Sequence, residues 1–478
     1  MIRVNKNLIF LFTGRLTQAV ISILTIRLMT ELLSQTEVGN QYIINSMILW
    51  FSLVLINPIG MFVNRHIHEW QKQGQLQAMV KNVNMYFLFI AVCSVPLLGA
   101  ARYFLKVGLT IQAEPLLIYV GIYIFFSTWF QTLISFFNLF EFQKQFVMLN
   151  VISQILGLGM AVVAVTWLQP TGLSWLSGLL AGQILSLVLG IFVYKKYFPQ
   201  SEINQTSSFS LFNKNTLIFC YPVALATLFM WFMNQGYRLY IEKYIGVEAL
   251  ATLGVALGLA ASVAALIEAL TTQYYYPAFY AKIAHSTLND RQAAWQKLWD
   301  NTAIIYIPFC FLTMATAPFL VRLLTAEKFH HVTLFVLMGA FIELFRQMSN
   351  VAYLASHAEK KTQNTIAPYL FGSLLLVFLL AVLRNFGLLD IFNICLCLVG
   401  VGLLTLVFNV VVVKRVLNVK INYLNLLKVF IFALPLLIIH YFNNQSASLS
   451  EQFILSCIAG TYCLFIIYRR TQLAAVRN

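Results

Sequence analysis

Long apolar stretches separated by short polar segments fill almost the whole chain of 478 residues. About fourteen such stretches occur, and most have roughly the 18 to 27 residues that an α-helix needs to cross a bilayer. Because a helix satisfies its backbone hydrogen bonds internally, each stretch is expected to be a membrane-spanning helix. The pattern predicts an all-α integral membrane protein with spans at 7–30, 39–63, 80–101, 115–140, 146–168, 175–194, 216–238, 249–275, 301–321, 332–356, 364–383, 389–413, 425–442 and 452–468.

Composition and segment lengths exclude several functions. With 60% hydrophobic and only 10% charged residues, this is no soluble globular composition. The segments between spans are short, so a folded domain outside the membrane is not expected, and the first span is too long for a secretory signal peptide. There is no P-loop and no Gly-rich dinucleotide motif. We therefore expect neither an enzyme nor a protein with a cofactor or a bound metal.

The distribution of lysine and arginine predicts the orientation. If the N-terminus is cytoplasmic, the inner segments hold about 21 of these residues and the outer segments about 7. Such a bias predicts that both termini are cytoplasmic. The net charge of +15 is mostly this same signal and does not indicate nucleic-acid binding.

A short charged motif occurs twice with the same internal spacing. Its residues are Arg27-Leu28, Glu31 and Glu37 after the first span, and Arg238-Leu239, Glu242 and Glu248 after the seventh. Because the copies are six spans apart, they share one orientation, as in parallel repeats. The motif predicts two pseudo-symmetric six-helix lobes, residues 1–200 and 201–420, with a C-terminal helix pair at 421–478. A chance match is the alternative.

Several predicted spans carry polar residues on one helix face, at spacings of three, four or seven. These stripes are Arg15, Gln18, Ser22 and Thr25; Thr128, Gln131, Ser135 and Asn138; Thr227, Asn234 and Arg238; and Glu343, Arg346, Gln347 and Asn350. For the stripe that begins at Thr128 we favour hydrogen bonding between helices. For the stripes with Arg15 and Arg346 we favour the wall of a water-filled cavity, because a charge needs more than one hydroxyl partner.

Charged residues inside spans are costly and mark paths for substrates or ions. Arg15 lies roughly 12 Å from the cytoplasmic end of its span, and Glu268 lies at a similar depth. Glu343 and Arg346 lie near the middle of span 332–356, close enough to pair with each other. Either glutamate is a candidate for ion coupling, and a permanent pair between Glu343 and Arg346 is the alternative.

Two further arginines lie near span ends. Arg238 is close to the predicted outer end of span 216–238, where snorkelling of its side chain is an alternative to function. Arg65 follows the inner end of span 39–63, where it is also explained by the positive-inside rule.

The order of several short motifs along the chain resembles the O-antigen type (Wzx-like) polysaccharide flippases of the multidrug/oligosaccharidyl-lipid/polysaccharide exporter superfamily. The motifs are Leu33-Ser34-Gln35-Thr36-Glu37-Val38-Gly39, Asn57-Pro58-Ile59-Gly60 with Arg65, Tyr221-Pro222, Arg238-Leu239-Tyr240-Ile241-Glu242-Lys243-Tyr244-Ile245-Gly246-Val247-Glu248, and Tyr353-Leu354-Ala355-Ser356-His357-Ala358-Glu359-Lys360-Lys361. One departure concerns Arg238: family members often carry an acidic residue just before this arginine, whereas this chain has Tyr237. Whether Arg238 has a carboxylate partner is left open, with Glu242 one turn away.

The resemblance implies a flippase of the bacterial cytoplasmic membrane that works by alternating access of its two lobes. Its substrate would be an undecaprenyl-pyrophosphate-linked glycan for O-antigen or capsule synthesis. Implied partners are membrane lipids, a polysaccharide polymerase and a chain-length regulator, with H⁺ or Na⁺ as coupling ion. Guanidinium groups bind pyrophosphate well. The candidate substrate-binding residues are Arg15, Gln18, Arg65, Arg238 and Arg346, and the candidate ion-coupling residues are Glu268 and Glu343.

Two other functions remain as alternatives. A multidrug or organic-cation antiporter of the same superfamily would need a cavity in which acids outnumber bases. A membrane-embedded polysaccharide polymerase would need a sizeable outer loop, and no outer segment exceeds about 15 residues.

The last two spans carry no charge apart from Lys428 at the membrane surface. They are expected either to support the bundle or, as the resemblance to lipid-linked peptidoglycan-precursor flippases implies, to line a groove for a lipid tail. We favour the groove.

Overall fold

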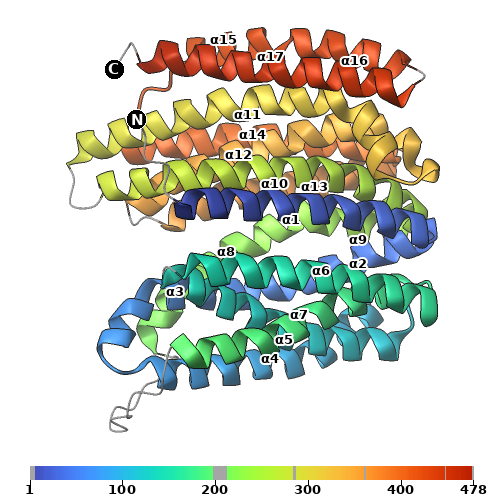
Figure 1. Ribbon diagram of the computed structural model, residues 1–478, viewed down its shortest axis with the longest axis vertical. Helices are drawn as coiled ribbons and strands as arrows, with labels where there is room; N and C mark the ends of the chain where they lie inside the picture. Colours follow the sequence, from blue (N-terminus) through green and yellow to red (C-terminus); the bar gives the residue numbers. More distant parts are fainter. Residues whose placement is uncertain are drawn as a thin grey trace. The chain divides into compact units, whose positions relative to one another are not determined.

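Every regular element in the described part of the chain is helical (Figure 1). The computed structural model describes residues 6–140, 142–197, 213–283, 287–359, 362–446 and 448–475. Within them, 13 helical segments are long and apolar enough to cross a membrane. Helix α1 (Lys6–Leu32), of 27 residues, precedes these segments and corresponds to the first predicted span. The predicted all-α membrane architecture is confirmed, and the protein is a multi-pass membrane protein.

The chain packs as two compact units, residues 1–251 and 252–478, called unit 1 and unit 2 below. After α1, the helices of unit 1 are α2 (Gln35–Phe51), η1 (Ser52–Ile56), α3 (Asn57–Lys72), α4 (Leu76–Leu105), α5 (Ala113–Leu139), α6 (Gln143–Trp167), α7 (Gly172–Tyr197), α8 (Lys214–Trp231), η2 (Phe232–Gly236), α9 (Tyr237–Tyr244) and the start of α10 (Val247–Ile283).

Unit 2 holds the rest of α10 and all later helices. These are α11 (Leu288–Leu324), η3 (Glu327–Val332), α12 (Thr333–Ala358), η4 (Thr362–Thr365), α13 (Ile366–Asn385), α14 (Ile391–Leu417), α15 (Tyr423–Ala433), α16 (Pro435–Gln445) and α17 (Leu449–Ala475). The boundary between the two units is set by how the helices pack. The predicted boundaries at 1–200, 201–420 and 421–478 were instead set by the proposed duplication. The lobe boundaries and the cytoplasmic termini stay predictions.

The helices start where polar side chains can satisfy free backbone N–H groups. Ser34 accepts a hydrogen bond from the backbone N–H of Glu37 at the start of α2. Asp390, which the sequence places at the mouth of a predicted span, accepts one from the N–H of Asn393 and so caps α14. Such caps stabilise a helix by about 1 kcal/mol. The acidic residue at the end of this predicted span therefore marks the start of a helix.

Small residues allow α6 and α7 of unit 1 to pack backbone against backbone. A Cβ atom added at Gly182 would lie 2.1 Å from the backbone nitrogen of Gly157, and one at Gly178 would lie 2.3 Å from Cα of Ala161. Pairs of small residues four apart on each helix permit this approach, which is a common way to pack helices in lipid.

The C-terminal helices α15, α16 and α17 pack against α11 of unit 2. Proline has no N–H, so Pro318 inside α11 leaves the carbonyl of Met314 without its usual helix partner. Nδ1 of His440 on α16 donates to that carbonyl at 2.8 Å, and Nδ2 of Asn443 donates to the next carbonyl, of Ala315, at 2.9 Å. An interruption in one helix thus fixes the position of another.

Helix α17 presents a narrow apolar stripe to this core. Ala459, Cys463 and Ile466 are almost completely buried, at spacings of four and three, whereas a Cβ added at Gly460 would meet nothing within 4 Å. These contacts give the C-terminal helices a supporting role against α11. A groove for a lipid tail stays a prediction.

The two adjacent small residues of α17 should respond differently to enlargement. Ala459→Leu is expected to destabilise the protein by roughly 1–3 kcal/mol because it overpacks a filled core. Gly460→Leu should leave stability nearly unchanged. The melting temperature of the detergent-solubilised protein measures both. Equal melting temperatures for the two variants would contradict this packing.

Candidate functional site: a cavity with one arginine and a carboxylate cluster

Unit 1 contains a cavity of about 660 Å³, here called the unit 1 cavity. Its walls come from α2, η1, α3, α4, α5, η2 and α9, and more than half of the residues in them are polar. Among the described residues that line it, Arg238 is the only charged one. The volume lies within the range of about 300–1,000 Å³ that is usual for small-molecule sites.

Two π-helical turns contribute to the wall. The π turn η1 supplies Ser52, Leu53 and Ile56, and the π turn η2 supplies Gln235. A π turn is wider than an α turn and frequently occurs at functional sites. The hydroxyl of Tyr86 on α4 donates to the carbonyl of Leu55 within η1 at 2.7 Å. The widened turn is therefore held from a neighbouring helix.

Arg238 lies at the start of α9 and is half-buried. Its guanidinium lies 5.2 Å from the ring centre of Tyr42, with Nη1 3.5 Å from Oγ of Ser46 and Nε 3.4 Å from the hydroxyl of Tyr237. Cation–π contacts of this kind stabilise a guanidinium without neutralising it. The side chain is thus positioned by aromatic rings and hydroxyl groups and keeps its charge toward the cavity.

Glu242 does not pair with Arg238, although it lies one turn away. Its Oε1 accepts a hydrogen bond from the backbone N–H of Gly108 at 2.6 Å. At the equivalent place in the first motif copy, Arg27 and Glu31 form an ion pair at 3.0 Å. Among the described residues, Arg238 has no ion-pair partner. Within the described part of the chain, this arginine is therefore not neutralised by a carboxylate.

The polar stripe of α5 lies on the cavity wall. Thr128, Gln131 and Ser135 line the cavity, and Asn138 does not. Ser135 also donates a hydrogen bond to Oδ1 of Asn64 on α3, at 3.5 Å. The sequence predicted that this stripe forms hydrogen bonds between helices. Of its four residues, Ser135 alone forms one with a described residue of another helix, and the sequence did not predict that three of the four line a cavity.

Sequence reasoning also missed the amides of α2 and α3. Asn45 and Ser52 are seven residues apart, as are Asn57 and Asn64, so each pair shares a helix face. Between them, Ser52 and Asn57 are five apart, which breaks the α-helical pattern and fits the i→i+5 hydrogen bonding of a π turn. All four line the cavity. A search that allowed one π turn would have found a continuous polar face.

Arg15 and Gln18 lie where α1 packs on α6, and neither lines the unit 1 cavity. Nη1 of Arg15 donates to Oε1 of Gln18 at 3.0 Å, and the guanidinium lies 5.5 Å from the ring centre of Phe146. Nε of Arg15 is buried and has no partner among the described residues. Gly14 allows the close approach, since a Cβ there would lie 2.2 Å from Cγ1 of Val147.

Arg65 belongs to α3, which runs past the predicted span end to Lys72. Its side chain is exposed, with the guanidinium 5.8 Å from the ring centre of Phe219. It does not line the cavity. Structure thus brings only one of the five candidate substrate-binding residues, Arg238, to the unit 1 cavity.

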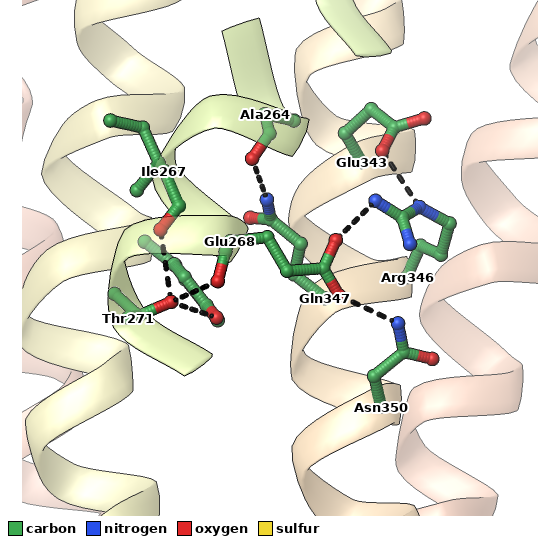
Figure 2. A network of polar contacts seen from close by, with 9 residues as sticks. Ala264, Ile267, Glu268, Thr271, Glu343, Arg346, Gln347 and Asn350 are labelled. Atoms are coloured by element: carbon green, nitrogen blue, oxygen red, sulfur yellow. Dashed lines mark hydrogen bonds and ion pairs between the residues drawn. The ribbon is translucent and has the colours of Figure 1, made fainter. Parts of the chain in front are cut away.

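Unit 2 holds a cluster of charged side chains on α10 and α12 (Figure 2). Arg346 donates from Nε to Glu343 and from Nη2 to Glu268, both at 2.7 Å. Asn350 donates to the second oxygen of Glu268 at 2.9 Å, and Gln347 donates to the carbonyl of Ala264 at 2.7 Å. One guanidinium is shared between two carboxylates, so the trio carries a net charge of −1 when both are ionised.

The cluster is largely enclosed. The side chains of Arg346, Glu268 and Glu343 are 28%, 20% and 15% exposed. A cavity of about 20 Å³ borders Glu343, Gln347 and Tyr306, enough room for one water molecule. The predicted pair of Glu343 and Arg346 is present in the structure, together with a second pair to Glu268 that residue spacing alone did not reveal.

A family model described as "Polysaccharide biosynthesis protein" matches residues 85–334, more than half of the chain. This chain belongs to that family. No curated protein sequence matches the chain.

Solved structures show the same fold. The lipid II flippase MurJ in an inward closed conformation aligns with a TM-score of 0.70 and 16% identity, covering 97% of this chain and 99% of that one. The eukaryotic MATE transporter AtDTX14 aligns with a TM-score of 0.55 and 15% identity, covering 89% of this chain and 96% of that one. An inward-facing multidrug resistance MATE family transporter of the MOP superfamily aligns with a TM-score of 0.51 and 13% identity, covering 87% of this chain and 96% of that one. This chain therefore shares the fold of these three proteins.

Proposed function

We propose that the protein is a flippase for a polyprenyl-pyrophosphate-linked oligosaccharide, moving it from the inner to the outer leaflet of a bacterial cytoplasmic membrane. The product would serve synthesis of a surface polysaccharide such as O-antigen or capsule. The observation that carries the proposal is the unit 1 cavity, in which Arg238 is the one charged residue among the described lining residues and has no ion-pair partner among them. The family membership and the flippase-like fold support it.

The charge of this cavity suits a diphosphate. A guanidinium presents several N–H donors in a fixed plane and binds phosphate oxygens in pairs. Arg238 is held by neutral groups, Tyr42, Tyr237 and Ser46, so binding of an anion breaks no ion pair. The prenyl tail can stay in lipid while the polar head crosses. An inside-negative potential assists outward movement of each negative charge by about 2.3 kcal/mol per 100 mV.

The cluster of unit 2 is proposed as the coupling site. With two carboxylates around one guanidinium it favours a cation, which here would be H⁺ or Na⁺. A substrate anion that draws Arg346 away would leave Glu268 and Glu343 free to take up that cation. Membrane lipids, a polysaccharide polymerase and a chain-length regulator are the proposed partners.

A multidrug or organic-cation antiporter is the second candidate, and the excess carboxylate in unit 2 is the observation that favours it. The unit 1 cavity opposes this candidate, because Arg238 repels a cation in a medium of low dielectric constant.

Removal of the cavity arginine should slow transport strongly. Arg238→Ala is expected to lower the rate roughly tenfold or more, because a hydrogen bond to a charged group contributes about 1.5–3 kcal/mol. Arg238→Lys should rescue only poorly, since an ammonium lacks the planar fork. The measurement is translocation of a labelled polyprenyl-diphosphate disaccharide in proteoliposomes.

The matched control is Lys243→Ala on the same helix, since Lys243 is exposed and donates to the carbonyl of Leu105 outside the cavity. Gly60→Phe is a second blocking variant: Gly60 lines the cavity, and a Cβ added there meets nothing within 4 Å, so a side chain at this position starts in open space. Normal transport in both Arg238→Ala and Gly60→Phe would refute the cavity as the transport site.

Arg15 is proposed as a second contact for the pyrophosphate. Arg15→Ala should greatly reduce surface polysaccharide while protein remains in the membrane, and Arg15→Lys should restore little of it. Surface polysaccharide is measured against the amount of membrane-inserted protein. Wild-type polysaccharide at normal protein abundance would show that Arg15 only packs α1 on Phe146.

Coupling should depend on the carboxylates of unit 2. Glu268→Gln and Glu343→Gln keep the shape of the side chain, but an amide cannot take up and release a proton as a carboxylate does. At least one is expected to abolish the response of transport to a pH or Na⁺ gradient in vesicles. Glu327→Gln, at an exposed residue of η3, is the control. Unaltered gradient dependence in both cluster variants would rule out this coupling site.

A further inference from the structure

Three side-chain amides on the wall of the unit 1 cavity have no hydrogen-bond partner among the described residues. They are Asn45 of α2, Asn57 of α3 and Gln131 of α5. An amide in a membrane-spanning helix normally bonds to a neighbouring helix, because an unpaired polar group in an apolar setting costs free energy. The cavity therefore presents three sets of donors and acceptors that are available to water or to a ligand.

These amides follow Arg238 along an elongated wall. Tyr42 and Asn64 are the first and last residues of the α2–η1–α3 segment that line the cavity; Arg238 contacts Tyr42, and Asn64 bonds to Ser135. Tyr42 and Asn64 are 22 residues apart in the sequence, which corresponds to roughly 33 Å of helix. A ligand bound to Arg238 by its phosphates would therefore have room to extend past several amides.

The chemistry of the wall fits sugar hydroxyls. An amide both donates and accepts hydrogen bonds, as a hydroxyl does. Ser52, Ser127 and Thr132 add hydroxyl groups, and Tyr123 and Phe87 add aromatic surface for the apolar faces of sugar rings.

The charge of the wall restricts the sugars further. Among the described lining residues there is no carboxylate, so a protonated amino sugar would lack a counter-charge. Arg238 is the single cation among the described lining residues, and the phosphates would occupy it. An acidic sugar elsewhere in the cavity would then be an unpaired anion.

We propose that the unit 1 cavity selects an uncharged oligosaccharide, recognised by the amides of Asn45, Asn57 and Gln131. This inference rests on the proposed function and specifies the substrate class of the same site. The glycan consists of neutral hexoses or N-acetylhexosamines, and the three amides determine specificity while Arg238 holds the diphosphate.

The test measures dissociation constants of the full-length protein in lipid nanodiscs for four defined probes. These are polyprenyl diphosphate without sugar, the same lipid with a neutral disaccharide of hexose and N-acetylhexosamine, and two analogues in which a hexuronic acid or a free amino sugar replaces the hexose. The neutral disaccharide lipid should bind about tenfold more tightly than the other three.

Asn57→Ala and Gln131→Ala should each weaken binding of the neutral disaccharide lipid about fivefold, the effect of one hydrogen bond, and leave the sugar-free lipid unaffected. Asn138→Ala is the matched control, since Asn138 continues the α5 stripe outside the cavity. It should change neither affinity. Melting temperatures of all variants verify that they fold.

Two failures can be distinguished. If the charged disaccharides bind as tightly as the neutral one, or if the amide variants affect both lipids equally or not at all, the inference on the glycan is wrong. If Arg238→Ala leaves binding of the sugar-free diphosphate unchanged, the proposed function itself is wrong.

Discussion

The structure depends on one constraint: in hydrocarbon, every backbone polar group needs a partner within the protein. Uninterrupted helices meet this requirement by themselves, and each interruption needs a donor from elsewhere. The hydroxyl of Tyr86 donates a hydrogen bond to a carbonyl in the π turn η1, and the ring of His440 donates one to the carbonyl that Pro318 leaves free. The first arrangement lies beside the unit 1 cavity and the second attaches the C-terminal helices. The irregular turns are thus where the fold gains a cavity and a docking point.

The same constraint governs the charges. Arg346 is enclosed and is shared by two carboxylates, which is how an interior guanidinium is usually satisfied. Arg238 is half-buried, has aromatic rings and hydroxyl groups around it, and opens onto a cavity of about 660 Å³. One arrangement is an ion-pair network with one carboxylate in excess, and the other is a guanidinium that lies beside a cavity and has no ion-pair partner among the described residues. Their difference supports separate roles for the two units.

The repeated motif shows how one pattern can serve two purposes. In the first copy Glu31 pairs with Arg27. In the second copy Glu242 binds the backbone of Gly108, which belongs to the loop between α4 and α5, and Arg238 has no ion-pair partner among the described residues. Identical spacing along a helix fixes which residues are near each other, but the loop that packs beside them decides which contact forms.

The sequence by itself determined that this is an all-α membrane protein and where its membrane-spanning helices lie. Apolar length predicted the helical spans, including the one at Asp390, because the energetics of burying a helix in lipid are a local property of about 20 residues. It also named Arg238 as one of several candidates, and it gave a pair between Glu343 and Arg346, which the structure contains, as an alternative to ion coupling. Only the tertiary structure decided that Glu268 joins that pair from another helix, and that Gln131 faces a cavity. The polar face from Asn45 to Asn64 escaped detection because a π turn shifts the helical period in its middle. Side-chain roles that depend on a neighbouring helix or on a change of period are set by packing, which a pattern along one helix does not contain.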